Sequence, residues 1–274
     1  MRASPVLLLT GVALLGLSSV TTGCASSYPR LSFAVEQRLL RETTLDDMPE
    51  ANAHANDTVV RVMRAGTKRA AGACSGALIG PRHVLTAQHC VVQMDGHREL
   101  TMDPLTAGDL HVELGADYLP WGRVGVREIH RCDGYNPNLD HDIAVLVLNK
   151  PVPSVVRPYE LSYDRPLRAG VFELAGFGSD REPRVVPLTS WGVLSTSRHY
   201  HSGPIAAFSQ EEIWVNIDGA PGDSGGPILD ATTGKVIAVV SRGRTKKEDK
   251  DSVPLVSGPR LGACRETIEL ALAR

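Results

Sequence analysis

The chain has 274 residues and a mass of 29.4 kDa, with 42% hydrophobic and 22% charged residues. These ordinary values exclude disordered and collagen-like proteins. The formal net charge is −2 and the one mixed charged run is short (246–251), so nucleic acid is not expected as the main partner. The 26 glycines and 18 prolines favour many turns and short strands. The five cysteines cannot all pair with one another.

The first element in chain order is the apolar, uncharged stretch Val6–Val20, which follows Arg2. It is too short to span a bilayer as a stable helix and is followed by small residues, so it predicts an export signal. One alternative is a signal peptide over 1–23 that resembles the bacterial lipoprotein type, with Cys24 as the lipidated residue. The other is ordinary signal cleavage near Ala25 or Ser26.

Either alternative predicts an exported chain, secreted or held at the cell envelope by a lipid on Cys24, in a compartment where disulfides persist. Residues 24–57 are then predicted to be a tether, with one possible helical patch at Leu31–Leu40.

From Thr58 onward the chain changes to short apolar runs separated by Gly, Pro and Asp, which predicts one domain over 58–274. This spacing is typical of an all-β sandwich or barrel. The predicted strands are Val59–Arg64, Ala77–Ile79, His83–Ala87, Gly125–His130, Ile143–Leu148, Val171–Ala175, Leu188–Leu194, Ile213–Ile217, Pro227–Leu229 and Val236–Ser241. A helix is predicted over Arg260–Ala273, where apolar residues recur three or four positions apart.

The strongest motif is Gly222-Asp223-Ser224-Gly225-Gly226-Pro227. One interpretation is a glycine-rich turn with a structural role only. A serine nucleophile explains the motif better, because it needs a base to take its proton and backbone donors for the oxyanion that forms. Glycines around Ser224 allow a tight backbone whose N–H groups point at substrate without obstruction.

Two further motifs stand upstream: LTAQHC at Leu85–Cys90, preceded by CSGALI at Cys74–Ile79, and DIAVLVL at Asp142–Leu148. With these three motifs in order, the chain resembles the trypsin/chymotrypsin-like serine endopeptidases over 58–274. The resemblance implies an all-β fold of two six-stranded antiparallel barrels with a C-terminal helix. It also implies that His89 is the general base, Asp142 its orienting partner and Ser224 the nucleophile, with an oxyanion hole from the N–H groups of Gly222 and Ser224.

The orienting carboxylate has two candidates in Asp140-His141-Asp142. Asp142 is favoured because it directly precedes the apolar run, and a buried position suits a group that must stabilise an imidazolium.

Substrate preference is approached through the same resemblance, which places Asp218 at the floor of the pocket for the residue before the cleaved bond. Ser241 and Gly243 then stand in the pocket wall. A carboxylate there predicts cleavage after Arg or Lys. The alternative is that Asp218 belongs to an Asp-Gly turn. Arg242 and its basic neighbours (Arg244, Lys246 and Lys247) would neutralise Asp218 or favour acidic substrate residues.

Activation is a separate question. In many members of the resembled family a newly formed N-terminus pairs with the Asp before the nucleophile, here Asp223. No Arg-Ile-Val-Gly-Gly-type site is present in the sequence. The hypothesis is that another side chain or the backbone satisfies Asp223 and that the chain folds active.

For the cysteines, the resemblance implies a Cys74–Cys90 bridge. It also places the C-terminal helix against the first barrel, where a Cys132–Cys264 bridge is plausible; the alternative is two buried free thiols. With lipid on Cys24, these pairs would account for all five cysteines.

The sequence therefore predicts a serine endopeptidase that acts on proteins or peptides through an acyl-enzyme and needs no cofactor. No metal site is expected, because His199-Tyr200-His201 lacks a third ligand. The alternatives are a catalytically silent binding module on the same fold and an esterase with the same triad.

Overall fold

The computed structural model describes residues 44–64, 74–94, 100–115, 120–136, 138, 140–166, 168–178, 198–244 and 253–274. Almost all regular structure in these ranges is β, and the one described α-helix lies at the C-terminal end. The expected all-β class is therefore confirmed.

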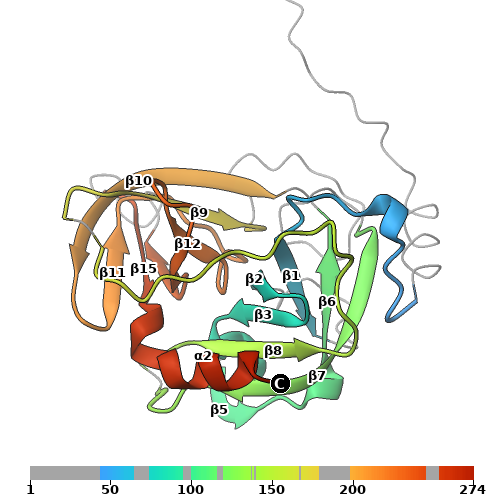
Figure 1. Cartoon of the computed structure of the whole chain (residues 1–274). Helices are drawn as coiled ribbons and strands as arrows, with labels where there is room; N and C mark the ends of the chain where they lie inside the picture. The colour runs from blue at the N-terminus through green and yellow to red at the C-terminus, as the bar shows by residue number, and fades with distance from the viewer. Residues whose placement is uncertain are drawn as a thin grey trace, which may run out of the picture. The chain divides into compact units, whose positions relative to one another are not determined.

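The first half of the domain is a closed antiparallel barrel with strand order β1-β2-β3-β8-β7-β6 (Figure 1). Runs of Val, Leu and Ile form these strands because branched side chains pack well on a pleated surface. In β8 every side chain is buried. The bounds are β1 Val59–Arg64, β2 Cys74–Gly80, β3 His83–Thr86, β6 Leu110–Leu114, β7 Gly122–Arg131 and β8 Ala144–Leu148.

The second half is a sheet with strand order β13-β12-β9-β10-β11-β15-β14 in the described residues. The expected six-stranded barrel is thus replaced there by seven strands, because the short β14 extends one edge. An isolated bridge between Ala238 and Arg260 connects β13 to the end of β15. The bounds are β9 Val171–Gly176, β10 His199–Phe208, β11 Glu212–Val215, β12 Pro227–Asp230, β13 Val236–Val239, β14 Arg242–Arg244 and β15 Leu255–Pro259.

Nine of the ten predicted strands fall on described strands, and β1 has the predicted bounds. The prediction for Leu188–Leu194 lies outside the described residues. The strands that were not predicted are β4 (Val92–Met94), β5 (Leu100–Pro104), β6, β10, β14 and β15.

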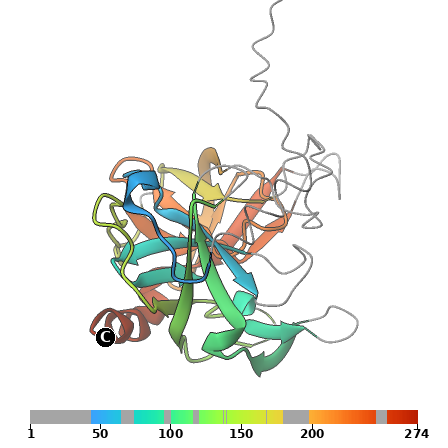
Figure 2. The same ribbon diagram turned by 90° about the vertical axis from the view of Figure 1, so that its right-hand side faces the viewer.

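The C-terminal helix α2 covers Arg265–Leu272, beside β8 of the barrel in both views (Figures 1 and 2). Its predicted start at Arg260 was too early, because Leu261–Cys264 forms a 3₁₀ turn instead. Ile268 and Ala271 face the barrel core and are fully buried. A disulfide joins Cys132, just after β7, to Cys264 at the start of the helix.

The last part of the predicted tether packs on the barrel. The Asp46 carboxylate accepts a hydrogen bond from the Gly125 N–H, and the Trp121 indole donates to Asp57 at 2.8 Å. The predicted signal, Cys24 and the Leu31–Leu40 patch lie outside the described residues. No helix within the described ranges has the length and apolarity needed to cross a membrane.

Candidate active site

His89, in the turn after β3, and Asp142, just before β8, form a doubly connected pair. The His89 Nδ1 lies 2.6 Å from Asp142 Oδ2, and the backbone N–H of His89 donates to Oδ1 at 2.7 Å. Asp142 is completely buried, whereas the His89 side chain keeps 12% of its surface exposed. With Nδ1 donating to the carboxylate, Nε2 is left as the basic nitrogen, which is the tautomer that a general base needs.

A third donor reaches the same carboxylate from the other half of the molecule. The Ser241 hydroxyl, just after β13, donates to Asp142 Oδ2 at 2.5 Å and is itself buried. Three donors are therefore aimed at Asp142, which satisfies a charge that would be costly to bury alone. The alternative Asp140 is exposed and accepts a hydrogen bond from Asn136.

Ser224 lies in a turn that two glycines shape. Gly222 and Gly225 have φ values of 107° and 84°, in the region where only glycine is unstrained. A Cβ on Gly225 would stand 2.2 Å from both the Ser75 carbonyl oxygen and the Thr86 hydroxyl. The turn therefore lies directly against the strand that leads to His89.

Ser75 of β2 holds this turn from the first barrel. Its N–H donates to the Ser224 carbonyl and its hydroxyl donates to the Gly222 carbonyl, both at 2.8 Å. The hydroxyl also accepts from the Phe177 N–H at 2.9 Å. Because Gly222 and Ser224 are the predicted oxyanion-hole residues, Ser75 orients that backbone across the two halves.

The contact at Gly225 gives a test of the turn. Gly225→Ala adds left-handed strain of about 1–3 kcal/mol and a clash with backbone, so it should lower the free energy of unfolding by more than the strain alone. Gly234→Ala is the matched control, because φ there is 68° and a Cβ would meet nothing within 4 Å. Urea denaturation of both variants compares the two costs. Equal losses of unfolding free energy in the two variants would contradict the close approach of Gly225 to Ser75 and Thr86.

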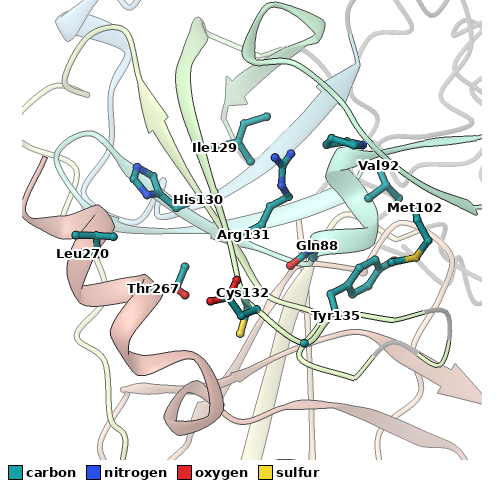
Figure 3. A pocket seen from close by; sticks show the side chains of 13 residues that line it. Gln88, Val92, Met102, Ile129, His130, Arg131, Cys132, Tyr135, Thr267 and Leu270 are labelled. Carbon is teal, nitrogen blue, oxygen red and sulfur yellow. The ribbon is translucent and has the colours of Figure 1, made fainter.

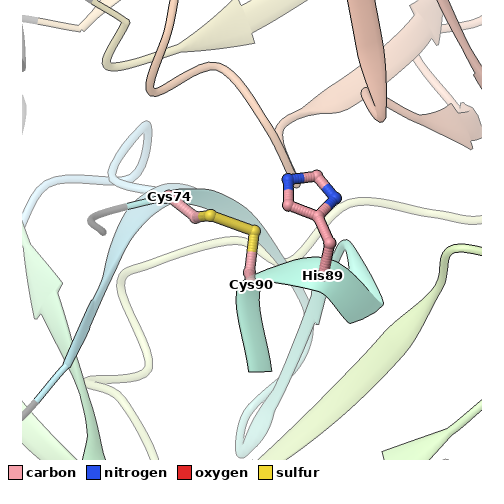
Figure 4. Close-up of side chains that lie close together, drawn as sticks. All are labelled: Cys74, His89 and Cys90. Carbon is pink, nitrogen blue, oxygen red and sulfur yellow. A yellow bond between two sulfur atoms is a disulfide. The ribbon is translucent and has the colours of Figure 1, made fainter. Parts of the chain in front are cut away.

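The predicted Cys74–Cys90 disulfide is present directly beside His89 (Figure 4). It joins the residue before Ser75 to the residue after His89, so it limits how far His89 can move from Ser75. These two sulfurs and His89 also form a cluster of possible metal ligands. Because the sulfurs are bonded to each other, they offer no thiolate to a metal ion.

The three predicted pocket residues have different surroundings. Asp218 is partly exposed, between β11 and the Ser224 turn. Gly243 is exposed on β14 and pairs with Val256 of β15. The Ser241 hydroxyl is directed to Asp142, and the role of this residue in substrate binding stays a prediction.

A pocket of about 610 Å³ lies on the other side of the His89 turn, between that turn and α2. Figure 3 shows Gln88 near its centre, Tyr135 and Met102 on one side, and Thr267 and Leu270 of α2 on the other. Burial, and secondly the Asp142 charge, raises the pKa of Tyr135 to about 12. The phenol therefore stays neutral at physiological pH.

Sequence reasoning missed Ser75, the contact of Ser241 with Asp142, and Tyr135. Ser75 stands in the CSG segment next to a predicted disulfide, but nothing in that segment distinguishes a serine that anchors a distant turn. Its partners Gly222, Ser224 and Phe177 are distant in the sequence and become neighbours only in the folded chain.

A barrel that carries a His–Asp pair beside a serine in a glycine-rich turn defines the class of chymotrypsin-like hydrolases. The comparison with family models agrees, because the trypsin family model matches residues 48–257. The chain belongs to the trypsin family.

Two curated relatives are similar over part of their length. The glutamyl endopeptidase of Bacillus licheniformis is 26% identical over 168 residues, which is 60% of this chain and 47% of that protein. The cercarial protease of Schistosoma mansoni is 29% identical over 198 residues, which is 63% of this chain and 71% of that protein. The chain thus spans about half the length of the first relative.

Among solved structures, a Glu endopeptidase in complex with MPD superposes with a TM-score of 0.61 and 21% identity. The match covers 80% of this chain and 91% of that chain. At this identity the likeness shows the fold.

Proposed function

We propose that the protein is an exported serine endopeptidase in which Ser224 is the nucleophile, His89 the general base and Asp142 the residue that orients His89. The observation that carries the proposal is the His89–Asp142 pair beside the Ser224 turn. Membership of the trypsin family and the endopeptidase names of the relatives support it.

In the proposed reaction the Ser224 hydroxyl attacks the peptide carbonyl carbon while His89 Nε2 takes the hydroxyl proton. The N–H groups of Gly222 and Ser224 stabilise the oxyanion. As the C–N bond breaks, His89 returns the proton to the leaving amine, and an acyl-enzyme remains on Ser224. Water then attacks the ester carbon while His89 takes its proton; the bond from that carbon to Ser224 Oγ breaks, His89 returns the proton to Oγ, and the acid product leaves. Asp142 holds the imidazolium that forms in each half of the reaction.

A serine-directed phosphonate separates an enzyme from a silent binding module. Intact mass spectrometry should find one phosphonyl group on the wild type and none on Ser224→Ala. An unlabelled wild type with a correct fold would overturn the proposal. The esterase alternative is tested on matched peptide and simple ester substrates; hydrolysis of the ester alone would favour it.

The lipid on Cys24 and the tether stay predictions for the segment before residue 44. Palmitate labelling of the full chain in a bacterial host tests the lipid, with Cys24→Ala as the control. Incorporation into the wild type alone is the expected result.

The preference for Arg or Lys also stays a prediction, and one contact stands against it. Val256 of β15 is completely buried, and its Cγ2 lies 2.6 Å from the position of a Cβ on Gly219 and 3.9 Å from one on Gly243. Its side chain therefore fills space between the two segments that the resemblance assigns to the pocket. We infer that the residue before the cleaved bond is small and uncharged.

An acidic substrate residue is less well supported by the described contacts. Arg242 stands between the proposed wall residues Ser241 and Gly243, and its Nη2 lies 3.1 Å from Glu212 Oε1. That carboxylate offsets the charge of Arg242; the other basic side chains of this segment, those of Arg244, Lys246 and Lys247, lie outside the described part of the chain.

Shortening Val256 should therefore widen the pocket. In Val256→Ala, kcat/KM for substrates with Arg or Lys before the cleaved bond should rise by about tenfold relative to those with Ala. A peptide library that varies this one residue measures the change. In the double variant Val256→Ala/Asp218→Asn, this rise in kcat/KM for Arg and Lys substrates should be lost. Efficient cleavage after Arg, Lys or Glu by the wild type would contradict the small-residue preference.

A further inference from the structure

Asp223, the residue before the proposed nucleophile, is a buried carboxylate with defined partners. It is 1% exposed. Its Oδ1 accepts from the Gly178 N–H and its Oδ2 from the Ala220 N–H, both at 2.8 Å. A buried carboxylate of this kind fixes the conformation of the turn that contains it, because losing its contacts would leave an unpaired charge in the interior.

A third partner completes the surroundings of this carboxylate. The Nε2 of His199 lies 2.9 Å from Asp223 Oδ1, and the His199 side chain is 16% exposed. The strand pairing explains the approach. His199 begins β10 and stands opposite Gly176 of β9, and a Cβ on Gly176 would be only 2.2 Å from Asp223 Oδ1. The missing side chain at Gly176 thus leaves the space in which the carboxylate meets the imidazole.

The segment before β1 does not supply this partner. The chain runs without a break from residue 44 into β1, and it is held at the first barrel through Asp57, which accepts from both the His54 N–H and the Trp121 indole. In the described residues, the side-chain nitrogen that lies against Asp223 is Nε2 of His199.

The geometry points to His199 as a positioning residue that takes the place of a newly formed N-terminus. By contacting Asp223, it holds Gly222 and Ser224 in the conformation in which their N–H groups face the substrate, so the chain is active without cleavage near β1. The inference rests on the proposed function of Ser224. Ser75 donates hydrogen bonds to the carbonyl groups of Gly222 and Ser224 in the same turn. The turn is therefore fixed by Ser75 as well as by Asp223.

Because Nε2 of His199, and not Nδ1, lies against Asp223, substitutions that place an amide nitrogen at one position or the other test the proposed role. The amide nitrogen of Gln can occupy the position of Nε2, whereas the amide nitrogen of Asn falls near Nδ1. His199→Ala and His199→Asn should lower kcat by roughly 10²- to 10³-fold, as expected when oxyanion-hole geometry is lost. His199→Gln should recover most of this loss. KM should change less than kcat, because the substrate contacts remain.

His201→Ala is the matched control. His201 lies on the same strand, two residues further on, with its ring centroid 4.9 Å from that of His199, and it is exposed. Its kcat should stay within about twofold of the wild type, as is usual for exposed sites. Circular dichroism and urea denaturation identify any variant that does not fold, and the Gln and Asn variants carry the comparison if the Ala variant is lost.

The rate of phosphonate labelling and the intact mass distinguish a failure of this inference from a failure of the proposed function. The rate of phosphonate labelling should fall in His199→Asn as kcat falls; an unlabelled wild type would instead overturn the proposed function. Intact mass of the labelled wild type should show a chain that still contains residues 44–58. The inference is overturned if Gln and Asn variants react at equal rates, or if the labelled molecules all begin at a new N-terminus near β1.

Discussion

Ser224→Ala should abolish peptide hydrolysis, with kcat lower by roughly 10⁶-fold, because no other group can form the acyl-enzyme. The fold should persist. The turn is held through backbone atoms of residue 224, whose carbonyl accepts from the Ser75 N–H, and these are unchanged by the substitution. Measuring kcat and the free energy of unfolding on the same preparation separates loss of chemistry from loss of structure.

Ser202→Ala is the control for this experiment, because Ser202 is an exposed serine on β10. Its activity should equal that of the wild type. If Ser224→Ala kept more than about one part in 10³ of the activity, a contaminating protease or another nucleophile would have to be responsible, and the assignment of Ser224 would fall.

Asp142→Asn should lower kcat by about 10⁴-fold while leaving the overall geometry in place. The carboxylate accepts from His89 Nδ1, the His89 backbone N–H and the Ser241 hydroxyl. An amide has one acceptor oxygen for these three donors, and its NH₂ would face a donor. His89 then loses the proton on Nδ1 and with it the basic Nε2 that must accept the proton of Ser224.

The neighbouring Asp140 offers the matched substitution. Asp140→Asn removes a carboxylate from the same loop, but this group is exposed and bonded only to Asn136 among the contacts described. Its kcat should stay near that of the wild type. An equal loss in the two variants would show that the charge of the loop matters, and the specific role of Asp142 would be contradicted.

The strands that could be predicted from the sequence are those with buried, uninterrupted apolar runs. β8 is the clearest case, since all five residues are apolar and buried. β10 could not be predicted, because most of its side chains are exposed and its segment contains Gly203 and Pro204. Its position comes from pairing with β9 and β11, and pairing between distant segments leaves no local pattern.

The same limit applies to the candidate site. His89, Asp142 and Ser224 were predicted because they stand in motifs, and the structure pairs the first two beside the turn of the third. Ser75 and His199 were not, because each acts on a backbone or carboxylate from a different part of the chain. Ser241 was predicted for substrate binding from the family resemblance alone, and its contact with Asp142 could not be predicted because the two residues are far apart in the chain.

The contacts of Ser241 and Ser75 have a consequence for truncated chains. The base and its carboxylate come from the first barrel, but the hydroxyl that completes the carboxylate's contacts and the turn that carries Ser224 come from the second half. A chain that stops before residue 241 therefore leaves the buried Asp142 without the Ser241 hydroxyl, even where the first barrel is complete.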